Sequence, residues 1–177
     1  MISEIDDEMV RFKIVERIVE TIVDPTNLNN SDHEKLFETV KRFNPKQLKD
    51  FVVTLAYNFK NLDDSISKLE YNEKSLDFLE KVMKHVANEL NNKFDDLESF
   101  DLALTIMEIH GKLFSWNKDE YKFVKSIIEK HKHLLKRRYD DVFDEERRMT
   151  IIKYIAIRFE ELLDEDLMIE ILENLRK

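Results

Sequence analysis

Glycine and proline are almost absent from this chain, and their scarcity limits the folds that it can adopt. Its 177 residues include one glycine, Gly111, and two prolines, Pro25 and Pro45. Hairpins, sandwiches and barrels need many turns, and turns depend on residues of this kind. Helices joined by short polar links fit the composition better. Because 42% of the residues are apolar, the chain can bury a sizeable core. We therefore expect an all-α fold, with residues 1–177 forming one domain of about eight helices.

Several classes of protein are disfavoured by what the chain lacks. It contains no Cys, which removes disulfides, thiolate nucleophiles and Cys-based zinc sites together. The N-terminal residues are acidic and include no apolar stretch of the kind found in signal peptides. No run approaches the 18 apolar residues of a membrane span. These features predict a cytoplasmic protein that does not enter a membrane.

Helix starts are marked by polar capping residues. Ser3 to Asp6 and Ser31 to Glu34 have the spacing of capping boxes, and Asn44 precedes a proline at a first helical position. Asn72, Asn117 (with Glu120 three residues on) and Asp164 are three further expected N-caps. The predicted helices lie near 4–23, 31–43, 45–60, 73–92, 96–114, 118–138, 144–162 and 165–176.

An internal repeat relates two consecutive segments without a gap. Residues 72–116 align with 117–161 at an offset of 45, so that Asn72 meets Asn117 and Thr105 meets Thr150. The pair Asp95-Asp96 meets Asp140-Asp141 in the same register. Shared aliphatic positions are common to any two amphipathic helix pairs, but a shared cap, a shared acidic link and a shared Thr indicate a structural repeat.

A period of about 45 residues with two helices resembles HEAT and armadillo repeats. The resemblance covers about residues 31–161 and implies a short α-solenoid or an irregular helical bundle. Its units would be a capping helix in 1–30, helix pairs in 31–71, 72–116 and 117–161, and a capping helix in 162–177. The segment 44–57 also looks like units of octotricopeptide-like RNA-binding repeats.

The two helices of each pair differ in amphipathicity. The first helix carries one apolar stripe, whereas the second is apolar nearly all round and should lie in an inner layer. The expected core residues of this layer are Phe100, Leu104, Met107, Ile152, Ile155 and Phe159. Its surplus apolar residues predict a second apolar face, partly covered by the terminal helices, with a partner groove near Tyr57, Ile109 and Tyr154.

No set of residues carries a recognisable catalytic or metal-binding motif. The five histidines match neither a Glu-x-x-His nor a His-Glu-x-x-His pattern, so no catalytic, cofactor-binding or metal-ligating residue is assigned. We expect His85, His131 and His133 to lie on the solvated surface. His110, on an apolar helix, is expected to be a core residue with a backbone partner, and a site residue is the alternative.

A basic run lies between acidic segments. Residues 122–138 hold seven Lys or Arg against one Glu, and residues 139–177 hold six against twelve acidic residues. The run could be a solvated helix C-terminus, since cations complement the helix dipole there, an anion or nucleic-acid contact, or a contact with the acidic C-terminal block. The cations concerned are Lys130, Lys132, Lys136, Arg137 and Arg138.

These features together favour a non-catalytic scaffold or adaptor that binds a protein through a helical-repeat surface. The alternative is a nucleic-acid-binding repeat protein that uses the basic run, which the net charge of −9 disfavours. The sequence predicts no cofactor, and it leaves open whether the chain forms a homo-oligomer.

Overall fold

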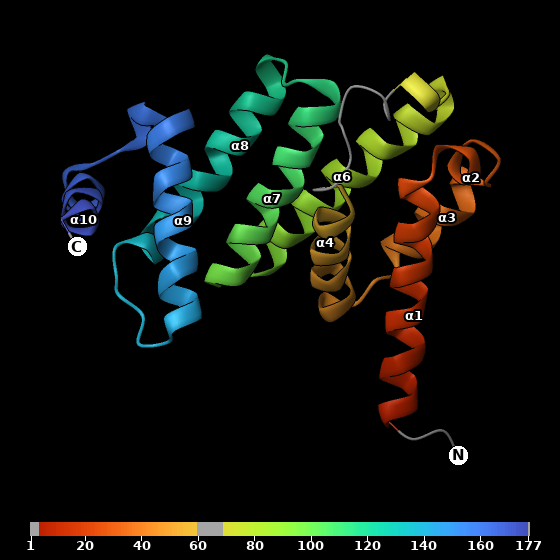
Figure 1. The fold of residues 1–177 in the computed structure, drawn as a ribbon, viewed down its shortest axis with the longest axis horizontal. Helices are drawn as coiled ribbons and strands as arrows, with labels where there is room; N and C mark the ends of the chain where they lie inside the picture. The colour runs from red at the N-terminus through yellow and green to blue at the C-terminus, as the bar shows by residue number, and fades with distance from the viewer. Residues whose placement is uncertain (1–3, 60–68, 177) are drawn as a thin grey trace.

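A computed structural model describes residues 4–59 and 69–176, and all regular secondary structure in these ranges is helical (Figure 1). The predicted all-α fold is therefore confirmed. The α-helices are α1 (Glu4–Val23), α2 (Pro25–Asn29), α3 (His33–Lys41), α4 (Pro45–Phe59), α6 (Glu73–Lys93), α7 (Leu97–Phe114), α8 (Lys118–His131), α9 (Val142–Arg158) and α10 (Glu165–Leu175). Two short 3-10 helices, η1 (Lys132–Leu135) and η2 (Glu160–Leu162), follow α8 and α9.

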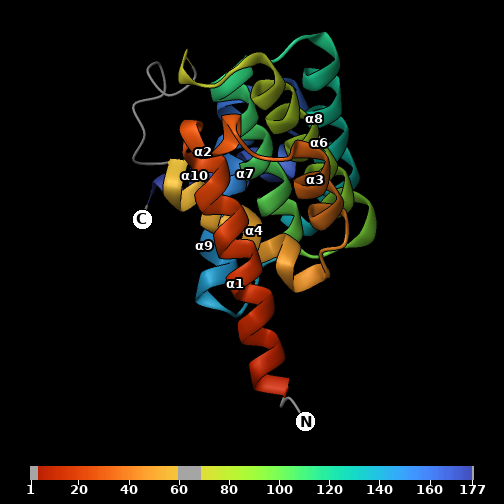
Figure 2. The ribbon, with the colours of Figure 1, turned by 90° about the vertical axis from the view of Figure 1, so that its right-hand side faces the viewer.

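The helices form an elongated stack with α7 at its centre. Figure 1 shows α1 near one end of the stack and α10 at the other. Helix α7 packs against α4, α6, α8 and α9, while α1 packs on α4 and α10 packs on α9. The N-terminal half of α1 extends beyond the body of the molecule in both ribbon views (Figure 2). None of the described helices combines the length and the apolar character that crossing a bilayer requires.

Local capping interactions set most of the helix starts, as the sequence predicts. The side chains of Asn72 and Asp164 accept hydrogen bonds from backbone N–H groups in the first turns of α6 and α10. Asn117 and Glu120 form a reciprocal capping box at the start of α8. Asn44 and Gln47 exchange the same pair of hydrogen bonds at the start of α4. Because these contacts span three residues, they can be recognised in the sequence alone.

Other boundaries differ from the predicted ones. The cap of α3 is Asp32 and not Ser31, because the Asp32 carboxylate accepts the Lys35 N–H. Helix α2 was not predicted; Asp24 caps it and Pro25 occupies its first turn. The expected box from Ser3 to Asp6 starts outside the described residues.

The predicted helix 118–138 is too long. Helix α8 ends at His131, and the 3-10 turn η1 that follows places Leu134 and Leu135 in the core. Helix α9 begins at Val142, two residues earlier than predicted, because the side chain of Asp141 caps it. Asp96 caps α7 in the same way, so the second Asp of each Asp-Asp link is a helix cap.

The core is one continuous cluster to which α7 contributes more buried residues than any other described helix. The predicted core residues are all buried, which confirms that prediction; they are Phe100, Leu104, Met107, Ile152, Ile155 and Phe159. Helix α7 is an inner helix, whereas α9 leaves Val142, Phe143 and Ile157 more than two-thirds exposed. The indole of Trp116 packs near Phe159 and donates a hydrogen bond to the Met107 carbonyl, so it joins the end of α7 to the next helix pair.

The two aligned segments correspond in helix starts but differ in packing. Helices α6 and α8 begin 45 residues apart, as do α7 and α9. Thr105 and Thr150 each donate a hydrogen bond to the carbonyl four residues earlier. Helices α6 and α7 pack closely, whereas α9 packs mainly on α7 and α10 within the described residues.

Candidate functional site

An apolar cavity of about 350 Å³ opens between α4, α7 and α9. Buried aliphatic side chains of Leu104, Ile109, Leu113 and Ile151 form much of its wall. The other described lining residues are Ala56, Phe59, Asp101, Thr105, Glu108, Lys112, Thr150 and Tyr154. Such a concave, mostly apolar site with a few polar groups is typical of a binding site.

The predicted groove residues are only partly brought together here. Ile109 and Tyr154 both line the cavity, but Tyr57 does not; it is 72% exposed beside the lining residue Ala56. The sequence predicted that the terminal helices partly cover this face, and that expectation is wrong. No described residue of α1 or α10 lines the cavity, because these two helices pack on α4 and α9 at opposite ends of the stack.

Exposed apolar side chains lie next to the cavity. Val53 and Tyr57 occupy one face of α4, one helical turn apart, and both are more than half exposed. Ile157, one turn beyond Tyr154 on α9, is 82% exposed. Exposed apolar side chains therefore flank the lining residues Ala56 and Tyr154 on the two helices that border the cavity.

The polar groups of the cavity are held in specific states by their surroundings. Burial raises the pKa of Asp101 to about 6, and the guanidinium of Arg147, 3.2 Å away, opposes this shift. Burial, together with the nearby carboxylate of Glu108, also raises the pKa of Tyr154, whose hydroxyl therefore stays protonated. Glu108 pairs with Arg158 at 2.7 Å. These groups can orient a bound chain.

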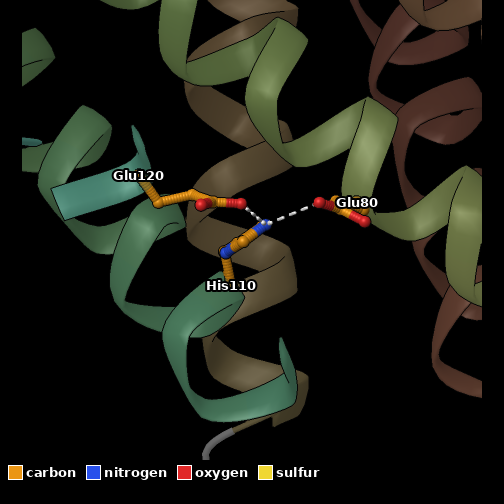
Figure 3. Close-up of side chains that lie close together, drawn as sticks. All are labelled: Glu80, His110 and Glu120. Atoms are coloured by element: carbon orange, nitrogen blue, oxygen red, sulfur yellow. Dashed lines mark ion pairs between the residues drawn. The ribbon is translucent and has the colours of Figure 1, made fainter. Parts of the chain in front are cut away.

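A second cluster lies on the other side of α7, where three helices bring acidic and histidine side chains together. Glu80 of α6 and Glu120 of α8 each place an Oε1 atom 3.9 Å from Nε2 of His110 on α7 (Figure 3). His110 is fully buried, as predicted, but the expected backbone partner is absent. Neither of its ring nitrogens has a hydrogen-bond partner among the described residues.

Lys84 supplies the positive charge of this cluster. Its Nζ lies 3.0 Å from Oε1 of Glu80 and 3.0 Å from Oε1 of Glu120. Burial favours the neutral acid at Glu120, but hydrogen bonds from Lys84 and from the backbone outweigh it and lower the pKa of Glu120. Burial also lowers the pKa of His110, so its ring is neutral near pH 7.

The remaining histidines divide between the surface and the core. His133 is exposed, as expected, and His85 is half-buried. The expectation that His131 lies on the surface is wrong: it is 1% exposed, and its Nε2 lies 3.0 Å from the side-chain oxygen of Asn91. A helix-face argument places His131 and His133 in different directions, but it does not determine which of them faces the core.

The basic run is engaged within the chain. Nζ of Lys130 donates to the Asn91 carbonyl, and Lys132 and Lys136 both pair with Asp164. Arg138 pairs with two glutamates of α10, and Arg137 donates to the hydroxyl of Tyr139. Three of the five cations thus contact the acidic C-terminal block, which was one of the alternatives that the sequence left open.

Sequence reasoning did not identify most residues of these two sites. Asp101, Thr105 and Glu108 lie on the helix that was expected to be innermost, and Glu120 was recognised only as a cap. The polar residues that interrupt the apolar sequence of α7 could have indicated these sites, because polar groups that are buried require partners.

Comparison of the chain with models of protein families, with curated proteins and with solved structures found no match. The functional assignment therefore rests on the geometry of the sites.

Proposed function

We propose that this protein is a non-catalytic scaffold that binds a protein partner, and that the cavity between α4, α7 and α9 accepts an amphipathic helix of that partner. The observation that carries the proposal is the open apolar cavity, whose lining residues Ala56 and Tyr154 are followed on their helices by the exposed side chains of Tyr57 and Ile157. An apolar surface of this kind, bordered by charged residues, is typical of an interaction site.

The extent of the apolar surface favours a macromolecule over a small ligand. A cavity of about 350 Å³ is at the lower end of the range for small-molecule sites. A ligand confined to it would leave Tyr57 and Ile157 in water. A helix lying across the opening could bury these side chains as well, while one or two of its own large apolar residues fill the cavity.

The secondary structure around the cavity favours a helical partner segment. The described residues contain no β-strand, so no sheet edge is present there to accept an extended peptide by strand addition. Grooves between packed helices commonly bind the apolar face of an amphipathic helix. The repeat proposed for 72–161 agrees with this function, because stacked helix pairs present a continuous surface to a partner.

Nucleic-acid binding through the basic run is less well supported. Phosphate contacts need cations that are free to pair with the backbone of the nucleic acid. Lys132, Lys136 and Arg138 already pair with carboxylates of 164–173, and the net charge of the chain is −9.

Site-specific photocrosslinking in cells tests the proposal. In the test protein, a photoreactive phenylalanine analogue replaces Tyr57. In a matched control, the analogue replaces Phe143, which is similarly exposed but lies at the start of α9, at the opposite end of that helix from Ile157. We expect Tyr57 to crosslink to one partner segment with apolar residues at helical spacing, and Phe143 not to. Crosslinks to the same proteins from both positions, or to nucleic acid, would contradict the proposal.

Two substitutions then test whether the cavity itself is used. Thr105→Arg places a long cation in the cavity opening, and Ile157→Glu adds a charge to its exposed border. Both should abolish the Tyr57 crosslink, whereas the control Phe143→Glu should keep it. Tyr154 is less suitable for substitution because it is half-buried beside Phe159. Circular dichroism should show unchanged helicity in all three variants.

A further inference from the structure

We propose that Glu80, His110 and Glu120 form a binding site for a divalent transition metal of the zinc class, and that Lys84 occupies the position of the cation when no metal is bound. The inference is independent of the function proposed for the cavity. It rests on the arrangement of Glu80, His110 and Glu120 at the junction of α6, α7 and α8 (Figure 3), and on the ion pairs of Lys84 with the two glutamates.

The distances are close to those of a metal site. One ligand atom from each of the three residues lies within 4.8 Å of the other two, and Nε2 of His110 is 3.9 Å from each carboxylate oxygen. Zinc bound tetrahedrally at about 2.0–2.2 Å needs its ligand atoms about 3.4 Å apart. Small rotations of the two glutamate side chains are enough to reach this spacing, and Glu80, which is 38% exposed, has room to move.

The unpartnered imidazole is the observation that points to a ligand. His110 is fully buried, both its ring nitrogens lack a hydrogen-bond partner among the described residues, and Figure 3 shows one nitrogen pointing between the two carboxylates. Buried polar groups in proteins are normally satisfied. A metal ion bound to Nε2 would satisfy this atom and would also neutralise the carboxylate charge.

The donor set selects the class of metal. An imidazole nitrogen suits zinc, cobalt, nickel and copper, whereas magnesium and calcium prefer oxygen ligands alone. Three protein ligands leave one tetrahedral position for water or for a group of another molecule. Since the ligands come from three helices, a bound metal would also clamp α6, α7 and α8 together.

Lys84 is the competitor of the metal. Its ammonium lies 3.0 Å from both carboxylates, which is where a cation is attracted most strongly. The side chain is 42% exposed, so it can rotate into solvent when a metal enters. Metal binding therefore has to displace Lys84, and a side chain without charge at this position should make binding tighter.

Zinc titration of the full-length protein against a chromophoric chelator tests the site. We expect one equivalent of Zn²⁺ to bind, Glu80→Gln to weaken binding at least about tenfold, and Lys84→Met to tighten it by about the same factor. His133→Gln is the matched control, because His133 is an exposed histidine outside the cluster, and its affinity should equal that of the wild type. Binding should also raise the melting temperature, since the metal binds the folded state.

Three results would overturn the proposal. The first is the absence of binding at micromolar zinc in both the wild type and Lys84→Met. The second is equal affinity of the wild type, Glu80→Gln and His110→Gln, which would place the metal elsewhere. If His110→Gln does not fold, Glu80→Gln decides alone. Competition by Mg²⁺ at equal concentration would likewise contradict a role for the imidazole.

Discussion

Nη2 of Arg148 lies 3.1 Å from Oε2 of Glu170, and this contact joins a buried guanidinium of α9 to helix α10. The Arg148 side chain is 1% exposed. It also donates to the Leu135 carbonyl and pairs with Glu145 one turn earlier on its own helix. A single side chain therefore holds together η1, α9 and α10, although the sequence shows it only as one of two adjacent arginines.

We expect Arg148→Ala to destabilise the protein by about 3–5 kcal/mol, because it removes one partner of a buried ion pair and leaves a cavity. Urea unfolding followed by circular dichroism measures the change. Arg137→Ala is the control: Arg137 is exposed, and its loss should cost less than about 0.5 kcal/mol. Equal losses in the two variants would show that Arg148 is not what holds α10 in place.

Phe159→Ala should cost about 3–5 kcal/mol, the usual range for removing a buried aromatic side chain. Phe159 is fully buried and contacts the rings of Trp116, Tyr121 and Tyr154. Ile157→Ala is the control: Ile157 lies two residues before Phe159, its side chain is 82% exposed, and its truncation should change the free energy of unfolding little. Equilibrium unfolding of both variants makes the comparison, and a loss below about 1 kcal/mol for Phe159→Ala would refute its place in the core.

Gly111→Ala should displace the indole of Trp116. A Cβ at this position would lie 2.9 Å from Nε1 of Trp116, which donates a hydrogen bond to the Met107 carbonyl. Alanine gains about 1 kcal/mol of helix propensity over glycine, but overpacking costs about 1–3 kcal/mol, so we expect a small net loss of stability.

Trp116 is the only tryptophan of the chain, so its fluorescence reports the displacement directly. The emission of Gly111→Ala should shift to the red as the indole becomes more exposed to water. An unchanged spectrum together with increased stability would show that the indole can move aside without cost.

Asp101 should make stability depend on pH. Its pKa is about 6 in the folded protein against 3.8 for a free side chain, so the folded state binds more protons between these values. The contribution of Asp101 to stability is therefore fully present below about pH 4 and is lost as the pH rises through 6. Relative to Asp101→Asn, the wild type should lose about 2–3 kcal/mol across this window.

Denaturant midpoints of the wild type and Asp101→Asn, measured from pH 4 to pH 7, test this expectation. The other titratable groups are the same in both proteins, so their contributions cancel in the stability difference between the wild type and Asp101→Asn. A stability difference that does not change with pH would mean that Arg147 compensates the burial of Asp101 completely.

The sequence determined those features that depend on neighbours along the chain. The scarcity of glycine and proline predicted the all-α fold, and the caps at Asn72, Asn117 and Asp164 depend on contacts within three residues. The apolar character of 100–109 identified α7 as an inner helix, because a helix without a polar face has to be covered on several sides.

Tertiary packing decided the features that depend on distant residues. The two glutamates beside His110 are 30 residues before it and 10 after it, and only the packing of α6 and α8 on α7 brings them within 4 Å. The burial of His131, the pairing of Lys136 with Asp164 and the uncovered cavity beside Tyr154 have the same origin. Helical periodicity gives the face of a helix on which a side chain lies. Which other helix packs on that face depends on crossing angles and loop lengths, and these follow from the packing of the whole core.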